Sequence, residues 1–183
     1  MPRYIQAMDD VLSPDVCKRL IAGFRADKRV APDPQPEYSR RRYLYLSDKP
    51  DWKELNAAAT RAALLVMERY FEILGCGPEE WLDDGWVLAR YAPGDRCALH
   101  DDGQCAEESR NGLRLATLLF YLNDAPGGET FFPAQDVRVR PVQGRAVVFP
   151  PWYTHPHEVL PCGGERFILQ TWITDTELKV VQR

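Results

Sequence analysis

The chain has 183 residues, of which 45% are hydrophobic and 27% charged, and its formal net charge is −4. This composition is that of an ordinary globular chain, and the length predicts a single domain over residues 1–183. Nucleic-acid binders take much of their affinity from basic side chains, so the acidic balance predicts no nucleic-acid partner. The longest apolar run, residues 62–67, is far shorter than the ~20 residues of a membrane span, so no membrane partner is expected either.

The cysteine and histidine content narrows the possible chemistry. Five cysteines make an odd number without a CxxC pair, and the N-terminus carries no apolar stretch typical of a signal peptide. The sequence therefore predicts free thiols and a cytoplasmic location. The chain has only three histidines, His100, His155 and His157, so any imidazole ligand or base comes from these positions.

Two helices are predicted in the N-terminal part. Ser13 and Pro14 suit the N-cap and first position of a helix whose apolar residues follow at helical spacing. Residues 51–54 form a capping-box pattern that opens a longer helix, and Gly75 ends it. Its expected buried stripe consists of Leu55, Ala59, Ala62, Val66, Tyr70 and Leu74.

Residues between the two helices are expected to be irregular or extended. Three prolines in 30–38 predict a loop, and 42–46 look like a strand.

From residue 86 onward the pattern changes to short β-branched and aromatic runs separated by turn residues. Eight strands in such an order predict a mainly β fold, a double-stranded β-helix or jelly roll, with the N-terminal helices packed on one sheet. Residues 1–80 are then a helical support region, and 86–173 are the jelly-roll catalytic core. The expected strands are 86–91, 97–102, 114–122, 128–132, 136–140, 145–149, 156–160 and 165–173.

The pair His100 and Asp102 is the first candidate for metal chemistry. On a strand, residues two apart share a face, so both side chains would project together while Asp101 points away. With one more histidine they would form the 2-His-1-carboxylate triad of non-haem Fe(II) sites. An HxD tripeptide alone is weak evidence, because a solvated strand end often carries both residues by chance.

The region after the buried strand 145–149 strengthens this interpretation. Four expected strands separate Asp102 from His157, enough for a jelly roll to bring the chain back beside its second strand. Arg166 then opens a strand that otherwise looks buried, where an unpaired guanidinium is costly and a bound carboxylate is favoured. A dicarboxylate that chelates the metal at one end and pairs with Arg166 at the other would fit both features.

Four motifs together resemble the 2-oxoglutarate/Fe(II) dioxygenases of the prolyl 4-hydroxylase superfamily. They are YxxGxxCxxHxD at 91–102, FYLND at 120–124, GGETFFP at 127–133, and HEVLP at 157–161 followed by Arg166. The last spacing is similar to that of the hypoxia-inducible-factor prolyl hydroxylases and their bacterial relatives. The resemblance covers residues 86–173 well and the N-terminal helix only loosely.

The resemblance implies a role for each site residue. His100, Asp102 and His157 would be the catalytic iron ligands. The co-substrate site would contain Arg166 on the distal carboxylate of 2-oxoglutarate, Tyr121 donating to the same carboxylate, Tyr91 and Trp172 lining the pocket, and Thr130 where some relatives carry an aliphatic residue. Fe(II), 2-oxoglutarate and O2 would be required, with ascorbate as a further reductant.

Two positions depart from the family's pattern. Gln170 stands where the hypoxia-type enzymes carry a smaller hydroxyl side chain, and Cys97 replaces the more usual aromatic residue. These departures bear on the shape of the pocket, and hence on the substrate, while they leave the iron triad intact.

The predicted reaction is hydroxylation of an unactivated C–H bond, with release of succinate and CO2, on a prolyl residue of an intracellular protein. A hydroxylase of a free amino acid or other small molecule is the alternative, and a non-catalytic metal-binding or oxygen-sensing module is the third hypothesis. A DNA-demethylating relative is disfavoured because Trp172 stands where those enzymes carry a second arginine.

Three further features carry weaker interpretations. His157 is favoured over His155 as third ligand because the family's Pro and Arg follow it at the family's spacing, and His155 is then a turn residue. Residues 40–42, three arginines, are expected to be a solvated loop face. Residues 103–112 are polar and are expected to form a lid or recognition loop.

Overall fold

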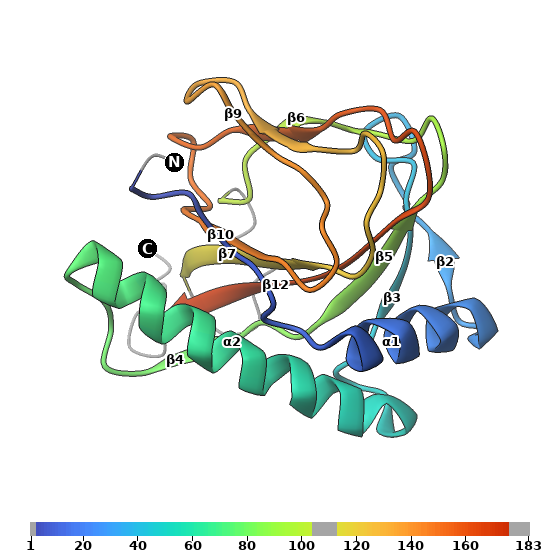
Figure 1. The fold of residues 1–183 in the computed structure, drawn as a ribbon, viewed down its shortest axis with the longest axis horizontal. Helices are drawn as coiled ribbons and strands as arrows, with labels where there is room; N and C mark the ends of the chain where they lie inside the picture. Colours follow the sequence, from blue (N-terminus) through green and yellow to red (C-terminus); the bar gives the residue numbers. More distant parts are fainter. Residues whose placement is uncertain (1–2, 104–112, 176–183) are drawn as a thin grey trace, which may run out of the picture.

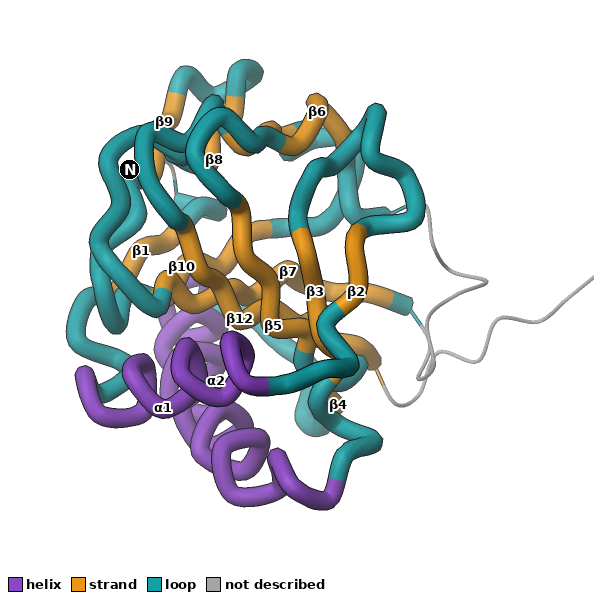
Figure 2. Tube along the Cα trace, turned by 90° about the vertical axis from the view of Figure 1, so that its right-hand side faces the viewer, coloured by secondary structure: helices purple, strands orange, loops and turns teal. Residues whose placement is uncertain are grey.

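The computed structural model describes residues 3–103 and 113–175. Figures 1 and 2 show three layers: two helices below, a large sheet in the middle and a smaller sheet above. The helices are α1 (Pro14–Ala26) and α2 (Lys53–Leu74), with a short 3-10 turn, η1 (Pro50–Trp52), before α2. The fold is mainly β, and the jelly-roll architecture with helices on one sheet is confirmed.

Both sheets are antiparallel. The large sheet has the order β1-β10-β7-β12-β5-β3-β2, and β4 pairs with β12 beside this path. Its strands are β1 (Gln6–Met8), β2 (Ala31–Pro32), β3 (Arg42–Tyr45), β4 (Trp81–Asp83), β5 (Val87–Tyr91), β7 (Arg114–Tyr121), β10 (Ala146–Phe149) and β12 (Arg166–Asp175). The small sheet has the order β6-β11-β8-β9, with β6 (Cys97–His100), β8 (Thr130–Phe132), β9 (Val137–Val139) and β11 (His157–Val159).

All eight strands expected from residue 86 onward are present, and no strand end differs from the predicted one by more than two residues. The strand expected at 42–46 is also present, as β3. The short strands β1 and β4 were not predicted, because three residues are too few to show a period. Since β1 and β3 lie in the large sheet, the first 80 residues supply strands as well as helices.

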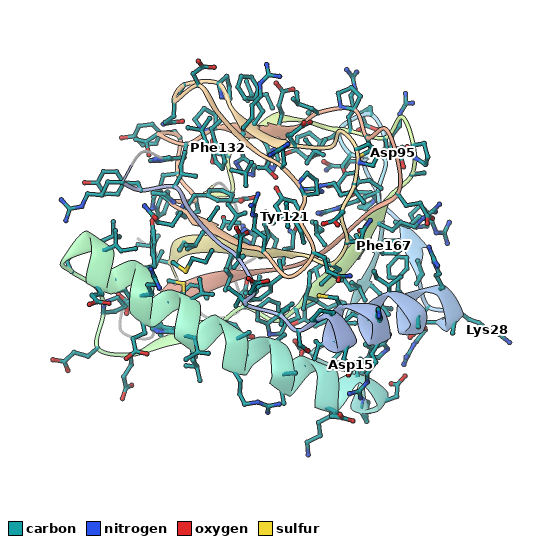
Figure 3. The ribbon with its side chains drawn as sticks, viewed as in Figure 1. Asp15, Lys28, Asp95, Tyr121, Phe132 and Phe167 are labelled. Carbon is teal, nitrogen blue, oxygen red and sulfur yellow. The ribbon has the colours of Figure 1, made fainter. Side chains whose placement is uncertain are left out.

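The alternation of apolar residues along β7 shows how the layers are held together. Leu118 and Phe120 pack toward the helices with the buried side chains of α1 and α2. Leu119 and Tyr121 point the other way, into the space between the two sheets. Figure 3 shows Tyr121 in this interior. Successive side chains of a strand alternate between faces, so one strand supports both cores. The functional residues described below belong to the space between the sheets.

The helix ends agree with the sequence in two places and differ in one. Ser13 accepts a hydrogen bond from the backbone N–H of Val16 at 3.3 Å, as an N-cap should, and Gly75 ends α2 with a φ of 72°. The capping box at the start of α2 is wrong, because the helix begins at Lys53 without a side-chain cap. Asp51 instead accepts hydrogen bonds from Arg29, and this ion pair withdraws its carboxylate from the helix.

The buried stripe of α2 largely follows the prediction. Ala59, Ala62, Val66 and Tyr70 are buried against the large sheet, and Leu55 and Leu74 are partly buried beside them. Neither helix in the described part of the chain has the length and apolar character that a bilayer crossing requires.

Candidate metal centre and its cavity

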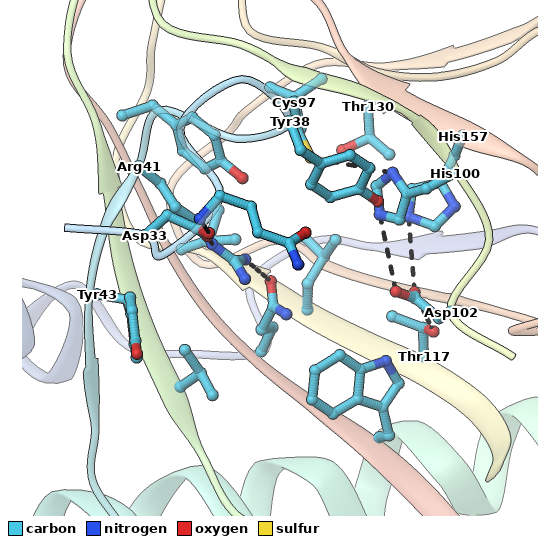
Figure 4. Close-up of a pocket in the computed structure, with 18 of the residues that line it drawn as sticks. Asp33, Tyr38, Arg41, Tyr43, Cys97, His100, Asp102, Thr117, Thr130 and His157 are labelled. Carbon is cyan, nitrogen blue, oxygen red and sulfur yellow. Dashed lines mark hydrogen bonds and ion pairs between the residues drawn. The ribbon is translucent and has the colours of Figure 1, made fainter. Parts of the chain in front are cut away.

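His100, Asp102 and His157 form a cluster whose ligand atoms all lie within 4.8 Å of one another. His157 pairs directly with His100 across β11 and β6, so the chain does return beside this strand. The Nε2 atom of His100 lies 3.7 Å from one carboxylate oxygen of Asp102, and Nε2 of His157 lies 3.6 Å from the other. Figure 4 shows the two imidazoles above the carboxylate. Two imidazoles and one carboxylate with open space beside them fit a facial Fe(II) site.

The backbone sets the orientation of both imidazoles. Nδ1 of His100 lies 2.8 Å from the carbonyl oxygen of Ala98, and Nδ1 of His157 lies 3.2 Å from that of His155. A carbonyl oxygen only accepts, so each Nδ1 carries the proton and donates it. Each Nε2 is therefore the ring atom left to bind a metal beside Asp102.

Asp102 is positioned by hydrogen bonds and not, as predicted, by sharing a strand face with His100. The strand β6 ends at His100, so Asp102 lies in the turn beyond it rather than on the same strand face. Its backbone N–H donates to the carbonyl oxygen of Pro151 at 2.8 Å, and its own carbonyl accepts from Nη1 of Arg114 at 2.8 Å. The hydroxyl of Thr117 donates to one carboxylate oxygen, Oδ2, at 2.6 Å. Both the backbone and the carboxylate of Asp102 are thus fixed.

The electrostatics of the cluster keep Asp102 charged. Burial opposes its ionisation, but His157, His100 and the Thr117 hydrogen bond outweigh burial and lower the pKa of this carboxyl. Burial lowers the pKa of His157 to about 4 although Asp102 opposes this, so His157 is neutral near pH 7. These states of Asp102 and His157 suit a divalent cation. At His100 burial opposes protonation, but Cys97 and Asp102 outweigh burial and raise the pKa to about 8, so a bound cation displaces a proton from this imidazole.

Thr117 is a positioning residue that the sequence analysis missed. We expect Thr117→Val to weaken binding of Fe(II) or Mn(II) by roughly 10- to 100-fold, the usual cost of losing a group that orients a metal ligand. Calorimetric titration with Mn(II) measures this. Thr117→Ser keeps the hydroxyl and should retain most of the affinity, and equal affinities of the valine and serine variants would contradict the role.

Arg166 lies at the start of β12 and is 1% exposed. Its Nη2 donates to the hydroxyl oxygen of Thr130 at 3.2 Å, but no described group accepts from Nε or Nη1. The guanidinium is flanked by the rings of Tyr91 and Tyr121, at 4.9 and 5.1 Å from their centroids. A buried cation with two unused donors is costly unless an anion binds there. The site therefore fits a carboxylate, bound by two parallel hydrogen bonds.

The hydroxyl of Tyr121, expected to donate to the 2-oxoglutarate carboxylate, donates to a backbone carbonyl of the protein. It donates to the carbonyl oxygen of Val139 at 3.1 Å, and the hydroxyl of Thr130 lies 2.7 Å away. Because Tyr121 gives its proton to Val139, Thr130 donates to Tyr121 while it accepts from Arg166. This chain of hydrogen bonds fixes the inner side of the guanidinium. A direct bond from Tyr121 to a ligand stays a prediction.

Gly128 gives Arg166 the room to reach this position. Its φ of 68° is left-handed, and a Cβ atom at this residue would lie 2.9 Å from Cδ of Arg166 and 2.8 Å from Sγ of Cys162. A side chain here would be strained and would also displace the arginine stem. The second glycine of the motif at 127–133 is thereby explained by packing around the arginine.

One cavity of about 480 Å³ unites the histidine–aspartate cluster with Arg166. Tyr91, Thr130 and Trp172 line it as predicted, whereas Tyr121 does not. From β12, every second residue faces this cavity: Arg166, Ile168, Gln170 and Trp172. Several lining residues were not predicted, among them Tyr38, Arg41, Arg114 and Thr117.

The three weaker sequence interpretations have different outcomes. Arg40 and Arg42 are exposed, but Arg41 points inward and lines the cavity, so the prediction of a solvated arginine face is wrong at this position. His155 lies in a bend and is buried beside Thr154, 2.9 Å from its hydroxyl oxygen, outside the three-residue cluster. The expected lid falls almost wholly on 104–112, outside the described residues.

Comparison with known proteins agrees with this geometry. Residues 86–174 match the family model of the 2OG-Fe(II) oxygenase superfamily. A protein of Acanthamoeba polyphaga mimivirus described as a putative prolyl 4-hydroxylase is 32% identical, over a match that covers 48% of this chain and 43% of that protein. The matched region therefore spans less than half of that relative.

Solved structures share the fold over nearly the whole chain. A Pseudomonas putida prolyl-4-hydroxylase is similar with a TM-score of 0.67 and 26% identity, covering 93% of this chain and 91% of that one. A Paramecium bursaria Chlorella virus-1 collagen prolyl hydroxylase, solved with 2OG, has a TM-score of 0.70 and 23% identity over 93% and 95%. A Trichoplax adhaerens prolyl hydroxylase, in complex with a hypoxia-inducible-factor peptide fragment, reaches 0.75 at 16% identity over 95% and 84%.

Residues 86–174, close to half of the chain, are thus similar to the 2OG-Fe(II) oxygenase superfamily, and the histidine–aspartate cluster fits that class. Within that class the chain is prolyl-hydroxylase-like, and the resemblance predicted from its sequence is confirmed.

Proposed function

We propose that residues 1–183 act as one Fe(II)- and 2-oxoglutarate-dependent dioxygenase that hydroxylates a prolyl residue of a protein or peptide and releases succinate and CO2. The observation that carries this proposal is the shared cavity, in which a His–Asp–His cluster and a buried arginine with two unused donors lie together. The arginine would have no evident purpose in a protein that binds a metal alone.

The residues fit both groups that the reaction requires. His100, Asp102 and His157 would hold Fe(II), and Arg166 would bind the distal carboxylate of 2-oxoglutarate. When bound, the iron and 2-oxoglutarate supply the oxidative chemistry that inserts an oxygen atom from O2 into a C–H bond. The protein's own part is to orient these groups and to limit access of water.

The chain's residues perform that part in three ways. Thr117 and Arg114 hold Asp102, so that one face of the cluster stays open to the cavity. Thr130 holds Arg166 at its inner edge, so the outer donors point to the ligand. Tyr38 packs its ring edge-on against His100, with 5.2 Å between centroids, and closes one side of the cluster.

The choice of a prolyl acceptor rests on relatives and on the lining of the cavity. The proteins named above are prolyl hydroxylases, and one was solved with a peptide. The cavity is lined by several aromatic rings, among them Tyr38, Tyr43 and Trp172, which suit packing against a pyrrolidine ring. The alternative acceptor, free proline, fits the same ring-lined space, but it differs from a prolyl residue within a peptide because both of its ends are charged. A cytoplasmic location stays a prediction.

The experiment incubates the enzyme with Fe(II), 2-oxoglutarate and O2, together with proline-containing peptides or with free L-proline. We expect succinate in proportion to a peptide product heavier by one oxygen atom, measured by mass spectrometry. Asp102→Ala serves as the inactive control. Turnover of free L-proline without any oxygenated peptide would favour the small-molecule alternative, and no succinate under any condition would contradict the oxygenase itself.

A further inference from the structure

The cavity has a second polar group, on the side away from the metal cluster. Figure 4 shows Asp33 and Arg41 across the cavity from His100, Asp102 and His157. Nε of Arg41 donates to Oδ2 of Asp33 at 2.9 Å, and Nη1 donates to Oε1 of Gln170 at 3.2 Å. We call Asp33, Arg41 and Gln170 the donor wall. Its members come from three segments: the loop after β2, the residue before β3, and the cavity face of β12.

The hydrogen bonds of the donor wall leave unused donors on Gln170 and Arg41. Because Oε1 of Gln170 accepts from Arg41, the amide nitrogen of Gln170 points away from that contact and keeps its two N–H groups. Nη2 of Arg41 likewise has no acceptor among the described residues, since Asp33 takes Nε and Gln170 takes Nη1. A ligand that binds to these free N–H groups must offer an acceptor oxygen.

The charge of the donor wall argues for a neutral acceptor. Asp33 and Arg41 form an ion pair at 2.9 Å, and their side chains are only 10% and 22% exposed. The two charges largely cancel at the distance of a ligand. A carboxylate would be attracted by Arg41 but repelled by Asp33, whereas a carbonyl oxygen loses less on desolvation and still accepts the hydrogen bonds.

Resting on the proposed function, we propose that the donor wall determines specificity by binding a main-chain carbonyl oxygen of the acceptor peptide. A peptide carries such carbonyls on both sides of every proline, while free proline presents a carboxylate in that place. The donor wall therefore selects a prolyl residue inside a chain over the free amino acid.

The test measures binding rather than turnover. The enzyme is loaded with Mn(II) and 2-oxoglutarate, and two probes are titrated by paramagnetic broadening of their NMR signals. N-acetyl-L-proline methylamide offers a neutral carbonyl, and N-acetyl-L-proline offers a carboxylate. We expect the methylamide to bind more tightly, and Gln170→Glu to weaken its binding about tenfold, because glutamate oxygens cannot donate and one hydrogen bond is lost to a group left unpaired.

A matched control separates this effect from a general change of charge. Gln6→Glu makes the same chemical change in β1, outside the cavity lining, and should leave binding of the methylamide unchanged. Gln170→Met, which has similar length and no donor, should reproduce the loss if the glutamate variant folds poorly. Circular dichroism melting reports the folding of each variant.

Several outcomes would overturn the proposal: no broadening of either probe, tighter binding of N-acetyl-L-proline, or unchanged methylamide binding in a folded Gln170 variant. Decarboxylation of 2-oxoglutarate without an acceptor is measured in parallel on the Fe(II) enzyme. Its absence would contradict the proposed function while the probe titrations still decide the role of the donor wall, so the two failures are distinguishable.

Discussion

Replacing His157 by alanine is expected to abolish metal binding and oxygenase activity, with a loss larger than about a hundredfold, because even groups that only orient a ligand contribute 10- to 100-fold. His157 is buried at 6% exposure and its Nε2 lies 3.6 Å from Asp102, whereas His155 lies outside the cluster and His100 is already part of it. The visible charge-transfer band of anaerobic Fe(II) with 2-oxoglutarate provides the measurement.

His155→Ala is the matched control for this variant. Both residues are buried histidines two positions apart, but only the backbone carbonyl of His155 contacts His157, and alanine retains that carbonyl. The band should therefore persist in His155→Ala. If the band survives in the His157 variant and disappears in the His155 variant, the assignment of the third ligand is wrong.

Arg166→Ala should raise the apparent KM for 2-oxoglutarate by roughly 30- to 1000-fold, which corresponds to ~2–4 kcal/mol for a buried, charge-assisted pair of hydrogen bonds. Affinity for Mn(II) in the absence of 2-oxoglutarate should change little, because Arg166 is not part of the metal cluster. Steady-state kinetics with varied 2-oxoglutarate, paired with metal titrations, separate the two effects.

Arg166→Lys tests whether the planar fork matters beyond its charge. A lysine keeps the positive charge but cannot form two parallel hydrogen bonds, so its KM should lie between those of wild type and the alanine variant. A folded alanine variant with an unchanged KM would show that the co-substrate is bound elsewhere.

Much of the fold could be predicted because it depends on local patterns. Turn residues and short apolar runs located all eight strands of residues 86–173, and helical spacing located the buried face of α2. The alternation of side chains along β7 also predicts that Thr117 faces the space between the sheets, although the sequence analysis did not single it out. Counting back from Tyr121 by twos gives Leu119 and then Thr117, so a polar residue on the inward face of an apolar strand was visible in the sequence.

The rest depends on contacts between distant parts of the chain. Arg41 looked like one of three solvated arginines because its partner Gln170 lies 129 positions away. The capping box failed for a similar reason, since Arg29 competes for Asp51 from 22 positions away. Asp102 does lie beside the two histidines, but its position comes from Pro151, Arg114 and Thr117 rather than from the strand. Local sequence patterns do not determine such competition.

The strand β12 carries both ends of the proposed reaction on one face. Arg166 and Gln170 are four residues apart on this strand, which places them about 13 Å from each other by the rise of an extended chain. The strand thus fixes the distance between the residue proposed to bind 2-oxoglutarate and the residue proposed to select the acceptor. On this proposal, a substitution at position 170 changes which acceptor is bound, while Arg166 and the metal cluster keep their roles. An insertion of one residue between these positions would turn one of them to the opposite face and separate the two tasks.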